Sequence, residues 1–140
     1  MQYLNQNKPF ELSVPSITSN WQNEQNAAAE MRLGPNAILV RPLGPGIDRE
    51  EAAAIVGLVA AEFRDRKSSP KRLLVDLSTV SVPSSMAIGL LLELARLAEE
   101  KGTVPHLHAS RRMLEVLRML QLDGRYTIVV SERRLAELLR

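Results

Sequence analysis

From residue 31 to the end of the chain, short apolar segments alternate with longer segments whose apolar residues recur at helical intervals. The short segments have the length and composition of strands, and the longer ones have one apolar face. Because parallel strands are joined by helical crossovers, this order predicts an α/β domain with a mixed, mostly parallel sheet and four helices. We predict strands at residues 31–33, 37–43, 72–77, 103–108 and 126–130, and helices that begin near Asp48, Ser84, Ser110 and Ser131.

Local signals support the predicted helix ends. Asp48 and Glu51 have the spacing of a capping box, in which each side chain accepts a hydrogen bond from the other residue's backbone. The helix that begins near Ser84 is apolar on several sides in its first half, so we expect other elements to cover more than its sheet side. Gly102 is expected to end that helix.

The chain divides into an N-terminal extension at residues 1–30 and a single domain at residues 31–140. The extension is rich in Asn, Gln and Ser and has no sustained periodicity. It is either a flexible segment or an arm that docks on a neighbour, with the strand-like alternation of residues 10–14 as the docking element. The sequence leaves both interpretations open.

Composition narrows the function classes. Eighteen basic and sixteen acidic side chains are interspersed, and only 4% of the residues are aromatic, which argues against nucleic-acid binding. The chain has no cysteine, so disulfides, thiolate chemistry and cysteine zinc sites are excluded. No apolar run reaches the roughly 18 residues of a membrane span, and the N-terminus lacks a signal-peptide layout. We therefore expect a cytoplasmic protein that does not insert into membranes.

Candidate catalytic and metal-binding residues are few. The seven glycines form no phosphate-binding loop, and residues 83–87 do not form a nucleophile elbow. His106 and His108 would point to one face of a strand, but no third metal ligand is evident, so we predict no metal site and no cofactor. Asp76, at the end of a predicted strand, is expected to accept backbone N–H groups of the following loop. These observations predict a protein that is not an enzyme.

Ser84 and Ser85 at the start of the second predicted helix carry the most functional information. Hydroxyls at this position ordinarily cap the first N–H groups of a helix. A phosphate group there would add about two negative charges at the positive end of the helix and would change the surface offered to a partner. Both serines are therefore candidates for phosphorylation as well as capping.

Several segments, in order and nearly without gaps, resemble a known family. They are residues 43–48 (Leu-Gly-x-x-Ile-Asp), residues 73–78 (Leu-Leu-Val-Asp-Leu-Ser), Gly89, Gly102, and residues 120–126 (Leu-Gln-Leu-Asp-Gly-x-Tyr). From residue 31 to the C-terminus, the sequence resembles the STAS domains shared by anti-sigma factor antagonists and the tails of sulphate transporters. The resemblance implies a STAS fold.

In antagonists of this family, the corresponding helix opens with Asp-Ser-Ser-Gly, and a partner kinase that is also the anti-sigma factor phosphorylates the second serine. The unphosphorylated antagonist binds the kinase and frees sigma, and phosphorylation breaks that complex. When Asp76, Gly89 and Gly102 are held in register, this motif falls on residues 84–87, Ser-Ser-Met-Ala. The phosphorylated serine is then replaced by Met86, which has no hydroxyl.

Two hypotheses follow from this departure. In the first, the domain binds a partner through the start of the helix without the usual phosphorylation, and Met86 contributes an adaptable apolar contact. In the second, the register slides by one residue, Ser85 is the phosphate acceptor, and Pro83 stands in the position of the Asp. The second requires a compensating insertion before Gly89, so we favour the first.

The resemblance implies a non-enzymatic binding domain of the anti-sigma factor antagonist type that acts in partner-switching control of transcription or stress signalling. The expected partner is an anti-sigma factor or a serine kinase, and the apolar second helix also allows a homodimer. The alternative is a structural STAS module in a transporter-associated or multi-subunit signalling complex. The residues expected to bind the partner are Pro83, Ser84, Ser85, Met86 and Ala87.

Overall fold

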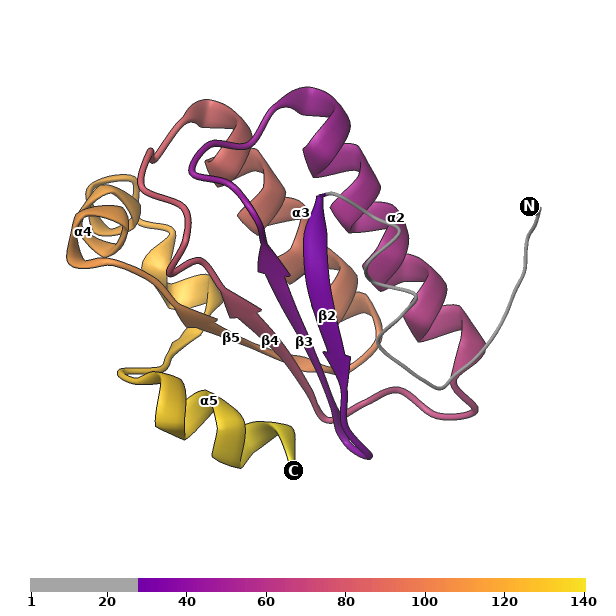
Figure 1. The fold of residues 1–140 in the computed structure, drawn as a ribbon. Helices are drawn as coiled ribbons and strands as arrows, with labels where there is room; N and C mark the ends of the chain where they lie inside the picture. The colour runs from indigo at the N-terminus through magenta and orange to yellow at the C-terminus, as the bar shows by residue number, and fades with distance from the viewer. Residues whose placement is uncertain (1–27) are drawn as a thin grey trace.

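A five-stranded sheet forms the centre of the computed structural model, which describes residues 28–140 (Figure 1). Its strands lie in the order β2-β3-β4-β5-β6, so each strand pairs with its neighbours in the sequence. β2 is antiparallel to β3, and the other pairs are parallel. The strands are β2 (Ala29–Leu33), β3 (Ala37–Pro42), β4 (Arg72–Asp76), β5 (Val104–His108) and β6 (Thr127–Ile128). The predicted mixed, mostly parallel sheet is confirmed.

Four α-helices follow the strands as the periodicity predicts. Each of the three parallel pairs is bridged by a crossover that contains one α-helix, and the fourth α-helix follows β6. A short 3-10 helix, η2 (Asp123–Arg125), precedes β6. The helices are α2 (Arg49–Asp65), α3 (Ser85–Glu100), α4 (Arg111–Met119) and α5 (Glu132–Leu139).

β3, β4 and β5 are each one residue shorter than predicted, and the first and last strands differ by more than one residue. The first begins at Ala29 instead of residue 31, because the antiparallel pairing with β3 continues to Ala29 opposite Pro42. The last contains only Thr127 and Ile128 instead of residues 126–130. After Ile128 the chain turns towards α5, and Val130 is 85% exposed. The strand-like segment predicted at residues 10–14 lies outside the described residues.

The sheet has an apolar layer on each face, because neighbouring side chains of a strand point to opposite faces. Ile38 and Val40 of β3 pack into the large core beneath α2, α3 and α4, whereas Leu39 packs towards α5. β4 divides in the same way, with Leu74 in the smaller cluster that contains Leu135 of α5. In Figure 1, α2 and α3 lie on one side of the sheet and α5 on the other. α5 therefore covers a separate face.

Helix capping explains where the helices begin and end. The Asp48–Glu51 capping box is present, and Ser84, Ser110 and Ser131 each accept a hydrogen bond from a backbone N–H in the first turn of their helix. Gly102 follows α3 with a φ of 71°, a conformation that glycine adopts without strain. The predicted starts at these caps and the stop at Gly102 are confirmed.

Helix α3 is held from two sides, as its apolar first half suggests. Its buried residues include Leu91 and Leu94, and α2 packs beside it. Tyr126 is buried and its hydroxyl donates a 2.6 Å hydrogen bond to the carbonyl oxygen of Leu91. Within residues 28–140, no helix is both long and apolar enough to span a membrane.

We expect Leu94→Ala to lower the free energy of unfolding by about 3 kcal/mol, because it leaves a cavity where a fully buried side chain packs. The measurement is urea denaturation followed by circular dichroism. Met119→Ala is the control, since Met119 is 81% exposed on α4 and should leave the midpoint nearly unchanged. Equal losses in the two variants would contradict this description of the core.

Candidate partner-binding site

The amino end of α3 lies beyond the carboxyl end of β4, where the chain leaves the sheet and turns back. Ser84 is the N-cap residue, and its Oγ accepts a 3.2 Å hydrogen bond from the backbone N–H of Ala87. The backbone N–H of Ser84 also donates to the carbonyl oxygen of Val82 at 2.9 Å. These bonds give the short segment before α3 a defined conformation. They therefore also fix the position of Ser85, the first residue of the helix.

The five residues expected to bind a partner differ in exposure. Ser85 is exposed, while Pro83, Ser84 and Met86 are half-buried. Met86 also packs against the large core, so only part of its side chain is open to a partner. The prediction that Ala87 binds a partner is wrong, because its side chain in the first turn of α3 is completely buried and offers no contact surface.

The loop between β3 and α2 lies beside the loop that leads into α3, and two hydrogen bonds join them. Thr79 donates a hydrogen bond from its hydroxyl to the carbonyl oxygen of Pro42 at 2.5 Å. The backbone N–H of Ser81 donates to the carbonyl oxygen of Pro45 at 3.1 Å. These bonds tie the segment before α3 to the segment between β3 and α2, and the two segments form one surface.

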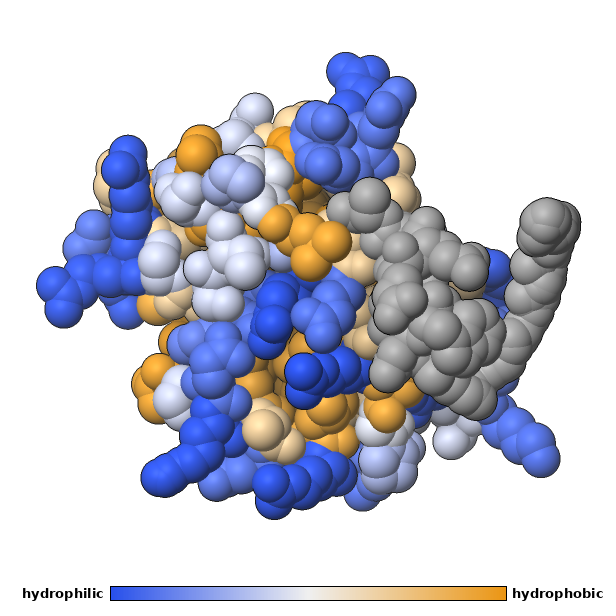
Figure 2. All heavy atoms as spheres, viewed as in Figure 1, coloured by the Kyte–Doolittle hydropathy of each residue, from blue (hydrophilic) through white to orange (hydrophobic). Residues whose placement is uncertain are grey.

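The sequence did not identify two exposed apolar side chains on these loops, one leucine and one valine. Leu43 is 49% exposed and Val82 is 51% exposed, although both are large apolar residues. In Figure 2, this end of the visible face is mostly pale, with isolated hydrophobic groups. We call the set formed by Leu43, Val82, Pro83, Ser85 and Met86 the tip surface. The two loops are far apart in the sequence, so their proximity could not be predicted, although both residues flank motifs that had been identified.

Asp76 closes β4 and stabilises the loop that leads to α3. Its side chain is fully buried, and its Oδ1 accepts a 2.9 Å hydrogen bond from the backbone N–H of Ser78, which confirms the predicted capping role. Its Oδ2 accepts a 3.0 Å hydrogen bond from Nε of Arg41. Burial by itself would raise the pKa of Asp76, but the hydrogen bonds from Ser78 and Arg41 outweigh it and the pKa is lowered.

Arg41 of β3 joins three carboxylates from different elements. In addition to Asp76, its guanidinium lies 3.2 Å from a carboxylate oxygen of Glu30 on β2 and 3.4 Å from one of Glu132 at the start of α5. Figure 2 shows hydrophilic side chains gathered over β2, β3 and β4 at the centre of the face that carries α5. The sequence reasoning did not identify Arg41, since the three carboxylates are far apart along the chain.

Asp76, His108 and Glu132 bring potential metal-ligand atoms within 4.8 Å of one another. His106 is not in this group, so the two histidines considered together in the sequence have different surroundings. Nδ1 of His108 lies 2.9 Å from the carbonyl oxygen of Val129, which requires a proton on Nδ1. The positive charge of Arg41 already pairs with the carboxylates of Asp76 and Glu132. We therefore interpret this cluster as a group of ion pairs.

We expect Arg41→Gln to lower the free energy of unfolding at pH 7 by about 3 kcal/mol, because it removes the positive charge that balances the buried Asp76 carboxylate. The lowered pKa of Asp76 also means that this carboxylate stabilises the folded state above its unfolded pKa of about 4, and that this contribution is lost as the pH falls. Removing Arg41 should raise that pKa, so the variant should lose less stability than the parent on acidification, and the difference between the two should shrink as the pH falls below about 4.

Urea denaturation between neutral pH and about pH 3 would measure both effects of Arg41→Gln. Arg112→Gln on α4 is the matched control, since Arg112 is exposed and has no ion pair among residues 28–140. Parallel pH profiles for Arg41→Gln and the parent would contradict the role given to Arg41.

Comparison with protein-family models and with curated proteins found no match to this sequence. Solved structures do match. A STAS-domain anti-sigma factor antagonist from Planctomyces limnophilus is 17% identical, with a TM-score of 0.65, and the match covers 79% of this chain and 97% of that one. The anti-sigma factor antagonist SpoIIAA in its unphosphorylated form is 15% identical, with a TM-score of 0.63 and coverage of 79% and 96%. An antagonist from Mycobacterium paratuberculosis is 21% identical, with a TM-score of 0.61 and coverage of 80% and 92%. The predicted fold is thus confirmed: this chain has the STAS fold found in anti-sigma factor antagonists.

Proposed function

We propose that this chain is a non-enzymatic, cytoplasmic protein-binding domain that acts in partner-switching control of transcription or stress signalling. Its partner is an anti-sigma factor or a serine kinase, and the contact is made by the tip surface. The observation that carries this proposal is the amino end of α3, which presents exposed Ser85 between half-exposed apolar side chains. The structural neighbours that are anti-sigma factor antagonists support the same kind of function.

The chemistry of the tip surface favours a protein partner. Leu43 and Val82 each leave about half of their surface in water, and burying apolar area contributes about 25 cal/mol per Å². Met86 adds a flexible thioether that adapts to an opposing surface. The loop bonds of Thr79 and Ser81 hold the two loops together, so little conformational entropy is lost when a partner binds.

A catalytic role is not part of the proposal. The hydroxyl of Ser85 lacks a general base, since among residues 28–140 neither a histidine nor a carboxylate side chain is hydrogen-bonded to it. Ser84 uses its Oγ to cap α3. A serine without a base is a weak nucleophile, whereas an exposed serine at a helix end is suited to contact another protein.

We propose that phosphorylation of this helix does not control the binding of the partner. Met86 takes the place of the phosphorylated serine, and its side chain packs partly into the core instead of carrying a hydroxyl at the surface. Ser85 is the remaining alternative acceptor, because it is exposed and its hydroxyl is not used for capping. The partner complex would then be controlled by the amounts of the two proteins and not by phosphate on this helix.

The binding test uses purified anti-sigma factors and serine kinases from the genome that encodes this chain. We expect at least one to bind with a Kd of about 10 μM or below, and we expect Ser85→Glu and Val82→Asp each to weaken that binding at least ~10-fold, because they place a charge in the contact. Isothermal titration calorimetry gives both values. Ser69→Glu is the matched control, since Ser69 is exposed and precedes β4 at the opposite end of the strand.

Failure of every candidate to bind would contradict the proposed function. Binding that Ser85→Glu and Val82→Asp leave unchanged would retain a partner but contradict the tip surface as its site.

The phosphorylation test is intact-mass analysis after incubation with each kinase that binds. We expect an unmodified chain. A phosphate added to the parent but not to Ser85→Ala would overturn this part of the proposal and would identify Ser85 as the acceptor. Met86→Ser is the informative companion variant, because it restores a hydroxyl at the position where the family carries its phosphoserine, and we expect it to gain a phosphate.

A further inference from the structure

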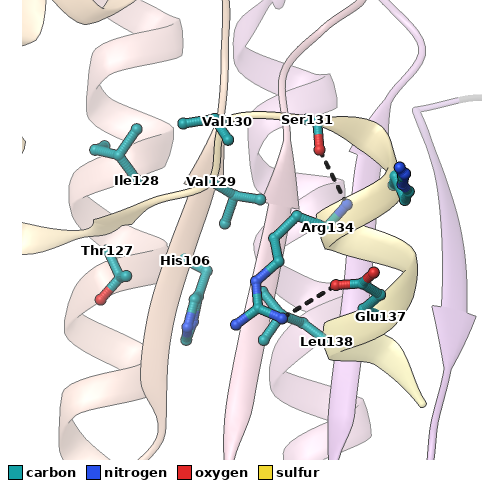
Figure 3. A pocket seen from close by; sticks show the side chains of 10 residues that line it. His106, Thr127, Ile128, Val129, Val130, Ser131, Arg134, Glu137 and Leu138 are labelled. Atoms are coloured by element: carbon teal, nitrogen blue, oxygen red, sulfur yellow. Dashed lines mark hydrogen bonds and ion pairs between the residues drawn. The ribbon is translucent and has the colours of Figure 1, made fainter.

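A pocket of about 470 Å³ lies on the α5 face of the sheet, between the β5–β6 edge and α5 (Figure 3). Its volume is within the range of small-molecule sites. His106 and Thr127 line it from the sheet, and Arg133, Arg134 and Leu138 line it from α5. No residue of the tip surface lines this pocket, so the two sites are separate.

His106 brings an unsatisfied hydrogen-bonding atom to the pocket. The residue is only 9% exposed, and its Nδ1 lies 3.1 Å from the carbonyl oxygen of Val104. A carbonyl oxygen only accepts, so Nδ1 carries the proton and Nε2 keeps a lone pair. Among residues 28–140, no donor is hydrogen-bonded to Nε2. In Figure 3 the imidazole lies between Thr127 and Arg134.

Burial lowers the pKa of His106, and the neighbouring positive charges of Arg72 and Arg134 lower it further. The imidazole is therefore neutral at neutral pH. Because no donor among residues 28–140 is bonded to Nε2, this atom is available to accept a hydrogen bond from a ligand hydroxyl. Thr127 shares this face of the sheet, since it pairs with His106 across β5 and β6, and its hydroxyl is a second polar group for the same ligand.

The charges that line the pocket favour an anion. Arg134 lies 3.2 Å from Glu137, and this pair leaves little net charge. Arg133 has no ion pair among the described residues, and it lines the same pocket. Arg72 adds a positive charge on the same face of β4, where Leu74 pairs with His106. The pocket thus combines an excess of positive charge with a buried acceptor.

Apolar side chains complete the lining. Leu138 lies near the carboxyl end of α5, and Val130 is 85% exposed and also lines the pocket. We propose that this pocket binds a small hydroxylated organic anion, a phosphate monoester or a hydroxy carboxylate, with the anionic group on Arg133 and Arg134 and a hydroxyl on Nε2 of His106. Arginine pairs well with either anionic group, because its planar guanidinium offers parallel N–H donors to both. The carbon skeleton of the ligand lies against Leu138 and Val130.

Titration of the ¹⁵N-labelled full chain, followed by NMR, tests this site with four probes. Glycerol 3-phosphate and lactate have both a charge and a hydroxyl on a carbon skeleton, inorganic phosphate lacks the skeleton, and glycerol lacks the charge. We expect the amides of residues 127–137 to shift with a Kd of about 1 mM or below for glycerol 3-phosphate or lactate. Inorganic phosphate and glycerol should bind at least ~10-fold more weakly. The organic anion that binds more tightly identifies the preferred anionic group.

Variants separate the roles of the lining residues. The double variant Arg133→Gln, Arg134→Gln should weaken the organic anion about 10-fold, because it removes the charge-assisted hydrogen bonds. Propyl phosphate and propionate, which keep the carbon skeleton and the charge but lack the hydroxyl, serve as comparison probes. His106→Phe should bring the affinity of the organic anion down to that of its unhydroxylated counterpart, because phenylalanine keeps a ring but has no acceptor. Arg111→Gln on α4 is the control for loss of one exposed positive charge and should bind like the parent.

The proposal is overturned if no probe shifts these amides at about 20 mM, or if the double arginine variant binds like the parent. Equal affinity of the parent for the hydroxylated anion and for its unhydroxylated counterpart would overturn the role given to His106. Thermal unfolding of each variant establishes that it is folded. Should His106→Phe fail to fold, the arginine variants still decide the outcome, because both arginines are exposed.

Discussion

The guanidinium of Arg41 connects its own strand, β3, to β2, β4 and α5. It contacts Asp76 at the end of β4, Glu30 on the edge strand β2 and Glu132 at the start of α5. Asp76 in turn binds the backbone of Ser78, where the chain turns towards α3. The loop that leads to the tip surface and the helix on the opposite face of the sheet therefore depend on one buried, compensated charge pair.

This arrangement separates two surfaces. The tip surface lies where the loops leave the carboxyl ends of the strands, and it combines a capped helix end with exposed Leu43 and Val82. The pocket that contains His106 lies between the sheet and α5. Because Glu132 begins α5 and also contacts Arg41, the position of α5 over the sheet is linked to the ion pair of Asp76. One sheet thus supports two separate surfaces with different side chains.

Much of the fold could be predicted because its signals are local. The capping box at Asp48, the serine caps and the glycine at 102 mark helix ends through hydrogen bonds within a few residues. The apolar periodicity identified both the helices and the strands. The bounds of the edge strands were wrong because pairing decides them: β2 continues to Ala29 opposite Pro42, and β6 ends when the chain turns to α5.

The candidate site was predictable only in part. Ser84 as the cap and Ser85 as an exposed residue follow from the start of a helix, but the burial of Ala87 depends on what packs beneath the first turn of α3. Asp76 was correctly interpreted as a loop cap, while its partner Arg41 lies 35 residues away and carries no local signal.

The order of strands and helices and the positions of the helix caps could be assigned from the sequence alone, because each depends on neighbouring residues. Only the tertiary structure decided which side chains meet across the sheet: Arg41 with its three carboxylates, Leu43 beside the loop of Val82, and His106 facing α5. The physical reason is that contacts between distant segments depend on register and on the face of the sheet that each helix covers, and neither is encoded within a single segment.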